Sequence, residues 1–214
     1  MKNFGEIVPG YNIPVLNERE IRASAGILFF FVLLSLMQIL YTNDFVMAKY
    51  VITIFLTDLL IRVFISPKYS PSLILGRLIV RNQVPEYVGA QQKKFAWIIG
   101  IFVSATMFTF LIIVNAFSPI TGVGCLICLI FLFFESAFGI CLGCIVYKWI
   151  YKQKAQYCPG EVCDVKSRQD IQKTSKVQLL ILAGFMTLIY FAAPYLNNQF
   201  IKKPYDLFGM YGTK

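Results

Sequence analysis

The sequence predicts an all-α membrane protein, a bundle of about five transmembrane helices. Of its 214 residues 57% are hydrophobic and only 14% are charged, whereas charged residues make up about 25% of an ordinary soluble domain. The mean hydropathy is +0.66. Apolar residues gather in long segments, each near the roughly 20 residues that a helix needs to cross a bilayer. A soluble fold would have too little polar surface to cover this material, so the lipid bilayer is the expected surrounding.

The apolar segments divide the chain into a membrane core and three polar regions. The predicted spans cover residues 22–41, 45–65, 95–117, 124–147 and 177–196. The mostly polar segment 1–21 lacks the short basic start and apolar core of a cleavable signal peptide, so the first span is expected to act as the insertion signal. Residues 22–150 form a predicted four-helix core, 151–176 a polar loop and 197–214 a short tail.

Basic residues predict the orientation of the chain in the membrane. Most of the 20 lysines and arginines precede the first span, or lie between the second and third or the fourth and fifth spans. The positive-inside rule therefore places the N-terminus in the cytoplasm and the C-terminus outside. These loops account for the net charge of +9, so no nucleic-acid partner is expected.

The connection between the second and third spans is expected to hold a short helix. It opens with the turn sequence Ser-Pro-Lys-Tyr-Ser-Pro (66–71). In the apolar stretch 71–84, Arg77 and Arg81 are four residues apart and share a helix face. This pattern predicts a helix lying in the plane of the membrane interface, with both arginines on anionic lipid. A re-entrant or buried connector is the alternative.

Three ionisable residues fall inside predicted spans, where an unpaired charge costs several kcal/mol. Asp58 and Arg62 are four residues apart in the second span and are expected to pair along the helix. Glu135 in the fourth span lies at a depth similar to that of Asp58, which predicts an Asp58–Arg62–Glu135 network. Arg62 should lie level with Cys141, where its charge would stabilise a thiolate. A network that only fixes helix packing explains the same residues.

The six cysteines form three pairs along the chain. Cys141 and Cys144 end the fourth span, and residues three apart on a helix are neighbours that approach disulfide geometry. We expect this pair to carry thiol redox chemistry if a thiolate is stabilised nearby. Cys125 and Cys128 begin the same span and are expected to act as small apolar core residues.

Two further patterns concern packing and metal binding. Gly139 and Gly143 form a small-x-x-x-small pair that predicts a close approach of another helix. No cofactor is predicted, although zinc or an iron–sulfur centre is a conceivable alternative. Its four ligands would be Cys141, Cys144, Cys158 and Cys163. Histidine is absent, which excludes histidine ligands and histidine acid–base catalysis, and no phosphate-binding loop or nucleophile elbow is visible.

Four strings carry a resemblance to a known family. They are Asn-Glu-Arg-Glu-Ile-Arg (17–22), Ser-Pro-Lys-Tyr-Ser-Pro (66–71), Gly-Arg-Leu-Ile-Val-Arg (76–81) and Glu-Ser-Ala-Phe-Gly-Ile-Cys-Leu-Gly-Cys (135–144). Over about residues 10–150 the chain resembles the bacterial membrane proteins of the domain of unknown function 4395. The resemblance implies the bacterial inner membrane, four spans, and an association of some members with thioredoxin-like or rhodanese-like proteins. The fifth span and the Cys158/Cys163 loop depart from it.

These patterns lead to two hypotheses of different classes. The first is a membrane thiol protein that exchanges electrons or sulfur through Cys141 and Cys144, with Arg62 tuning the thiolate. Its expected partner is a thioredoxin-like or rhodanese-like protein. The second is a non-enzymatic accessory subunit of a larger membrane complex, with other membrane subunits as partners. The sequence supports neither a channel nor a transporter, because it has no repeat of broken helices.

Overall fold

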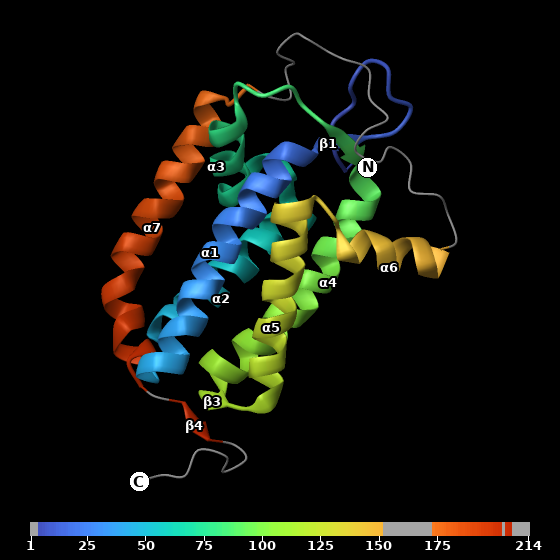
Figure 1. Cartoon of the computed structure of the whole chain (residues 1–214). Helices are drawn as coiled ribbons and strands as arrows, with labels where there is room; N and C mark the ends of the chain where they lie inside the picture. Colours follow the sequence, from blue (N-terminus) through green and yellow to red (C-terminus); the bar gives the residue numbers. More distant parts are fainter. Residues whose placement is uncertain (1–3, 152–172, 203, 207–214) are drawn as a thin grey trace.

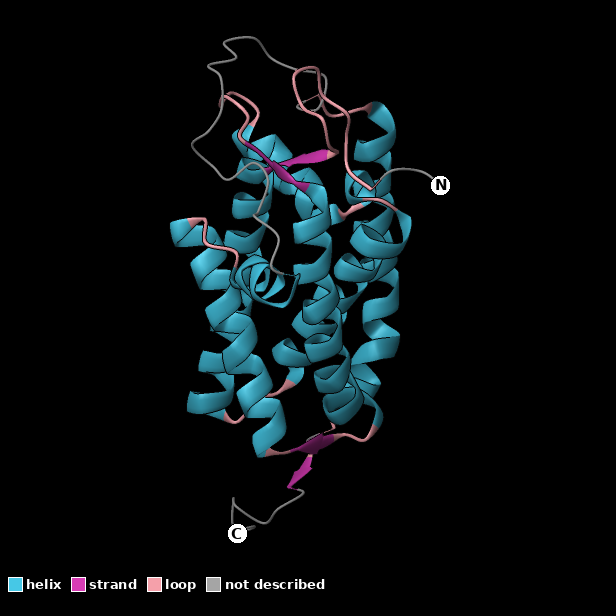
Figure 2. Ribbon diagram, turned by 90° about the vertical axis from the view of Figure 1, so that its right-hand side faces the viewer, coloured by secondary structure: helices cyan, strands magenta, loops and turns pink. Residues whose placement is uncertain are grey.

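The computed structural model describes residues 4–151, 173–202 and 204–206. Helices α1, α2, α4 and α5 stand side by side as a bundle, and α7 lies along one side of it (Figures 1 and 2). The α-helices are α1 (Glu18–Thr42), α2 (Val46–Leu60), α3 (Pro71–Val80), α4 (Ala90–Phe108), α5 (Pro119–Phe133), α6 (Leu142–Tyr151) and α7 (Lys176–Phe200). A π-helical turn continues three of these helices: η1 (Ile61–Ile65) follows α2, η3 (Thr109–Ile113) follows α4, and η4 (Phe134–Phe138) follows α5.

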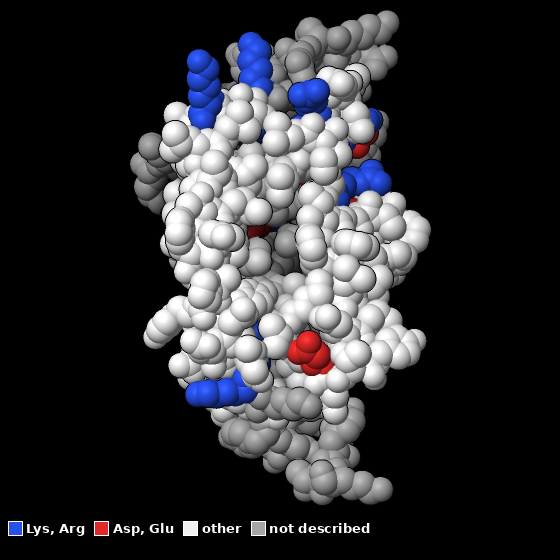
Figure 3. Space-filling view, turned by 90° about the vertical axis from the view of Figure 1, so that its left-hand side faces the viewer, with Lys and Arg blue, Asp and Glu red and all other residues white. Residues whose placement is uncertain are grey.

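The fold is that of an all-α membrane protein. Among the residues described, four helices are long and apolar enough to cross a membrane, namely Glu18–Thr42, Ala90–Ile113, Pro119–Phe138 and Lys176–Phe200. The second predicted span is present as α2 and η1, which together run for about 30 Å. It carries Lys49, Asp58 and Arg62, all buried inside the bundle. On the face drawn in Figure 3 charged side chains stand near the two ends, and the broad middle is almost entirely uncharged.

Two short strand pairs close the ends of the bundle. At the end that holds α3, called the basic end below, β1 (Val15–Asn17) pairs antiparallel with β2 (Tyr87–Gly89). At the opposite end, β3 (Ala116–Phe117) pairs parallel with β4 (Tyr205–Asp206). Strands β1 and β2 lead directly into α1 and α4, and Asn17 caps α1 by accepting a hydrogen bond from the Arg19 amide.

Helix α7 is attached to the bundle mainly at its two ends. Near the basic end, Gln178 Nε2 donates to the Lys68 carbonyl at 2.9 Å. At the opposite end, the buried Lys49 ammonium donates to Asn115 Oδ1 at 2.7 Å and to the Lys202 carbonyl at 2.8 Å. The Tyr50 hydroxyl contacts Asn197 Oδ1 at 2.8 Å. The apolar face between these contacts is exposed, as suits a lipid-facing helix.

The predicted short helix between the second and third spans is present as α3, but the lipid contact predicted for Arg77 is wrong. Helix α3 packs against the beginning of α1 so closely that a Cβ on Gly76 would lie 2.5 Å from the Glu20 carbonyl oxygen. Arg77 is buried, and its guanidinium donates to Glu20 Oε2 at 3.1 Å. Arg81 is exposed, so only this arginine stays a candidate for lipid contact.

The fourth predicted span is wrong at its C-terminal end. The helix that begins with α5 ends at Phe138, and Gly139 takes a left-handed conformation with φ of 68°. Few residues other than glycine adopt this conformation without strain. The Ile140 amide closes the end by donating to the Phe134 carbonyl. Helix α6 then leaves the bundle axis and runs sideways (Figure 1), so Cys141 and Cys144 stand at a helix beginning.

Candidate functional site: a cysteine pair beside buried charges

The Cys-Leu-Gly-Cys sequence forms the N-terminal turn of α6. Cys141 directly precedes the helix, and its carbonyl accepts the amides of Cys144 and Ile145 at 3.0 and 3.1 Å. The Cys144 amide also donates to Cys141 Sγ at 3.2 Å. The two cysteines form a disulfide, with their Cα atoms 5.1 Å apart. Because a helix N-terminus presents amide donors and a partial positive charge, this position favours a thiolate on Cys141 once the bond is reduced.

Glycine between the two cysteines lets α6 lie directly on α4. A Cβ added at Gly143 would lie 2.5 Å from the Cβ of Ala96. The rings of Phe95 and Tyr147 meet next to this contact, with centroids 5.4 Å apart. The close approach predicted for Gly143 is therefore present. Gly139 does not share it, because the turn at Gly139 faces the Arg22 guanidinium instead.

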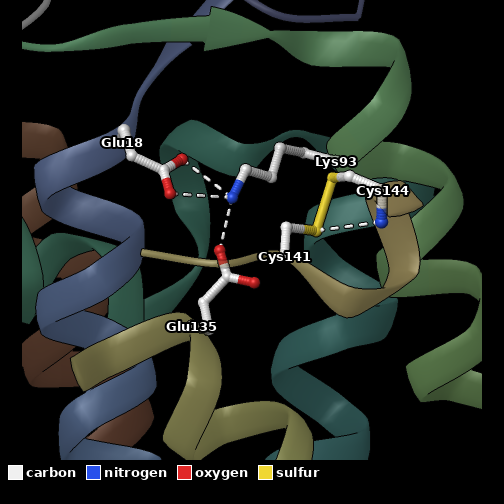
Figure 4. The surroundings of a disulfide bond; sticks show 5 residues. All are labelled: Glu18, Lys93, Glu135, Cys141 and Cys144. Atoms are coloured by element: carbon white, nitrogen blue, oxygen red, sulfur yellow. Dashed lines mark hydrogen bonds and ion pairs between the residues drawn. A yellow bond between two sulfur atoms is a disulfide. The ribbon is translucent and has the colours of Figure 1, made fainter. Parts of the chain in front are cut away.

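A buried lysine and two carboxylates lie together on one side of the disulfide (Figure 4). The Lys93 ammonium pairs with Glu18 Oε2 at 2.8 Å and with Glu135. These three residues come from α1, α4 and η4, so the triad joins three helices at the point where α6 begins. Two carboxylates against one ammonium leave a formal charge of −1 when all three groups are ionised. The triad thus places a cation and a proton acceptor near the thiols, and its second carboxylate weakens the effect of that cation on a thiolate.

The predicted pair of Asp58 and Arg62 is confirmed. Arg62 Nε donates to Asp58 Oδ2 at 2.8 Å, and both side chains are at most 4% exposed. Serine hydroxyls complete the cluster: Ser24 accepts from Arg62 at 2.6 Å, and Ser70 donates to Asp58 at 2.7 Å. Buried ions of opposite sign are stable only with such additional hydrogen bonds.

Of the two further roles predicted for this cluster, the network with Glu135 is wrong, and the effect of Arg62 on a Cys141 thiolate stays a prediction. Glu135 does not join the Asp58–Arg62 pair, because its carboxylate is bound by Lys93 on a different helix. The Arg62 guanidinium is engaged by its serine and aspartate partners and lies over the Trp97 ring, 5.1 Å from its centroid. Arg62 and Cys141 do line the same cavity of about 70 Å³. Figure 4 draws Lys93 beside the cysteine pair, with its ammonium turned toward the two carboxylates.

A third charge cluster fastens the N-terminal segment over the basic end. Glu6 pairs with Lys68 at 3.3 Å, and Glu20 with Arg77 at 3.1 Å. Burial raises the pKa of the Glu6 carboxyl, although Lys68 and Arg77 act in the opposite direction. Arg19 contacts Glu86 at 2.6 Å, which links α1 to the approach to β2. These pairs fix the position of the first turn of α1, which contains Glu18, relative to α3 and α4.

Of the four remaining cysteines, one pair lies within the residues that the structure describes and the other lies outside them. Cys125 and Cys128 are free thiols buried in α5. Cys158 and Cys163 lie outside the described residues, so the four-cysteine metal hypothesis is untested. Within the part of the chain that the structure describes, no three or more His, Cys, Asp or Glu side chains group as a metal site would require.

Sequence reasoning missed Glu18 and Lys93. Lys93 was counted among loop charges because the third span was predicted to begin at residue 95, whereas α4 begins at Ala90. Glu18 lies at the end of a polar segment and is one of the acidic residues in the first turn of α1. One signal was present, since a carboxylate inside a predicted span needs a cation, but the predicted bounds put Glu135 deep in its span and Lys93 outside the membrane.

Comparison with known protein families finds a match. A family model described as a domain of unknown function, DUF4395, matches residues 16–152. This region contains the bundle core and the cysteine pair of α6 and ends before α7. No curated protein and no solved structure matches the chain.

Proposed function

The chain belongs to the DUF4395 family, whose description names no activity, and from the site itself we propose that it is a membrane thiol–disulfide exchange protein. Cys141 and Cys144 are its redox pair. The expected location is the bacterial inner membrane, with the basic end toward the cytoplasm as the positive-inside rule requires. The partner class is a soluble dithiol protein of thioredoxin-like or rhodanese-like type.

The position of Cys141 at the beginning of α6 carries this proposal. A thiol becomes reactive as a thiolate, and helix N-termini and nearby cations stabilise thiolates. Cys141 has both, since the Cys144 amide points at its sulfur at 3.2 Å and Lys93 lies beside the pair. Continuing the helix through Gly139 would have placed Cys141 in a helix interior, where amide groups are already engaged.

Unequal exposure assigns different roles to the two sulfurs. Cys141 is only 8% exposed, whereas Cys144 is half-buried. A partner thiolate therefore attacks the Cys144 sulfur, and Cys141 leaves as the stabilised thiolate, which is the faster direction of exchange. The partner's second thiol then attacks the mixed disulfide. The partner ends oxidised as a disulfide, and Cys141 and Cys144 end as two thiols, with Glu135 available to exchange the proton.

Trapping of the mixed disulfide in cells tests the proposal. In Cys141→Ser the internal disulfide cannot form, so oxidised partners should stay bound to Cys144. We expect acid-quenched, alkylated cells to show a partner adduct that disappears on reduction. Cys144→Ser should trap much less, because Cys141 is buried, and Cys158→Ser serves as the matched control.

The outcome decides between the two hypotheses. Absence of any adduct in Cys141→Ser, together with unchanged oxidation of the pair when cells are treated with a thiol oxidant, would contradict exchange at this site. The accessory-subunit hypothesis would then be the better account of the chain. It expects Cys141 and Cys144 to be replaceable by serine together without effect on any partner's redox state.

A further inference from the structure

A second cavity lies between the helices at the end opposite the basic end. Its volume is about 450 Å³, within the range of pockets that hold small organic ligands. The walls come from the later turns of α1, the first turns of α2 and α5, and the last turns of α4. Because all four core helices contribute, the cavity belongs to the bundle interior and is separate from the cysteine pair of α6.

The lining combines an uncharged apolar wall with two thiols. No Asp, Glu, Lys or Arg lines it, and Phe45, Phe55 and Met107 are among its side chains. Cys125 and Cys128, which are free and buried, lie on the wall from successive turns of α5. Tyr41 and Asn43, near the C-terminal end of α1, and Thr121, in the first turn of α5, add hydroxyl and amide groups. An uncharged, largely apolar ligand with a few hydrogen-bond acceptors fits this chemistry.

We propose that this cavity binds a membrane quinone and that Cys125 and Cys128 reduce it. The two thiols give up two electrons and two protons and form an S–S bond. The quinone takes up the two electrons, and its two oxygens take up the two protons to give the quinol. Reactants and products are uncharged, which suits a wall without ionised groups. In bacterial membranes, quinones accept the electrons that protein thiols release when they form disulfides.

The spacing of the two cysteines is compatible with this bond. Helical residues three apart have side chains close together, and the disulfide range of Cα separations is about 4.4–6.8 Å. The pair at Cys141 and Cys144, with the same spacing, has Cα atoms 5.1 Å apart. A lipid acyl chain would fill the same volume, but neither the thiol pair nor the polar groups at one end would contribute to its binding.

The first experiment isolates this thiol pair. With Cys141, Cys144, Cys158 and Cys163 all changed to alanine, Cys125 and Cys128 are the remaining cysteines of the six. The reduced variant in lipid nanodiscs is mixed with decylubiquinone, whose reduction is followed by its ultraviolet absorbance. We expect one quinone reduced for each Cys125–Cys128 disulfide detected by mass spectrometry. If the quinone stays oxidised and both thiols stay free, the proposal is overturned, and the exchange proposed for Cys141 and Cys144 is unaffected.

A cavity-blocking variant provides the second test and uses the wild-type cysteines. Gly122 lines the cavity, and a Cβ added there meets no atom within 4 Å, so Gly122→Leu should fill the space without a clash at Cβ. Gly184→Leu is the matched control, because Gly184 on α7 is equally open but outside the cavity. We expect Gly122→Leu to slow quinone reduction at least tenfold and Gly184→Leu to leave it unchanged. Equal rates for Gly122→Leu and wild type would contradict binding in this cavity.

Discussion

Arg62 lies buried among serine hydroxyls, and Asp58 supplies the negative charge that balances it. The change Asp58→Asn keeps the shape of the side chain but leaves Arg62 with neutral partners only. We expect the free energy of unfolding in detergent to fall by about 3–5 kcal/mol. The matched change Glu86→Gln removes the acid of a partly exposed pair and should cost about 1 kcal/mol or less. Equal losses for the two variants would show that burial does not set the strength of the Asp58–Arg62 pair.

Lys93 is the second residue whose charge has a specific expected effect. With Lys93→Met, Glu18 and Glu135 lose their shared cation, and two carboxylates then face the cysteine pair. A thiolate on Cys141 becomes less favourable, so alkylation of the reduced pair should slow roughly tenfold, equivalent to about 1.4 kcal/mol. Arg62→Met should change the rate less than Lys93→Met does. The reverse order would support the role that the sequence predicts for Arg62.

The sequence allowed the Asp58–Arg62 pair to be predicted because both residues lie on one helix, four positions apart. The partner of Glu135 could not be predicted in the same way, since Lys93 is 42 residues distant in sequence. Its identity depends on how α4 and η4 pack. Similarly, Arg77 looked like a lipid-binding residue because its own helix is apolar, and only the packing of α3 on α1 reveals Glu20 as its partner.

Among the helices, the break at Gly139 determines what the cysteine pair can do. Composition predicted one continuous span through residue 147, because residues 136–147 contain no proline or charge to mark its end. A single glycine with φ of 68° ends it instead. The sequence predicted that Gly139 and Gly143 form one packing pair on a continuous helix. In the structure Gly139 makes the turn and Gly143 makes the contact with α4.

The contact at Gly143 leads to a prediction about α6. In Gly143→Ala the new Cβ would lie 2.5 Å from the Ala96 Cβ, so α6 must move away from α4. We expect a loss of about 1–3 kcal/mol in stability, the usual cost of overpacking, and slower alkylation of the reduced pair as it moves from Lys93. Gly184→Ala, in an open position of α7, should leave both unchanged or raise stability slightly, by up to about 1 kcal/mol. Faster alkylation in Gly143→Ala would mean that α4 only shields the pair.

For the whole molecule, the bundle of spans was predictable because hydropathy and the length of apolar segments depend little on tertiary contacts. The cavities and charge clusters were not, because they arise where several helices meet. The two ends of the bundle also differ in character. The charge clusters that hold Asp58, Glu18 and Glu20 gather toward the basic end, and the uncharged cavity lies toward the other.

Labelling of introduced cysteines tests the proposed orientation. Cysteines placed at Lys68 and at position 166 should be shielded from a membrane-impermeant maleimide in intact cells, and one at position 214 should react. Native cysteines are removed beforehand, and permeabilised cells serve as the control for reactivity. Labelling at Lys68 and position 166 but not at position 214 would invert the molecule, and the partner of Cys141 and Cys144 would then be extracytoplasmic.

The rate at which each cysteine of the reduced protein reacts with iodoacetamide tests the central claim most directly. Peptide mass spectrometry would follow all six cysteines in one sample at neutral pH. The account predicts that Cys141 or Cys144 reacts faster than Cys158, because the α6 N-terminus and Lys93 favour a thiolate, and that the buried Cys125 and Cys128 react slowest. If Cys141 and Cys144 react far more slowly than Cys158, they are packing residues, and the thiol-exchange function is contradicted.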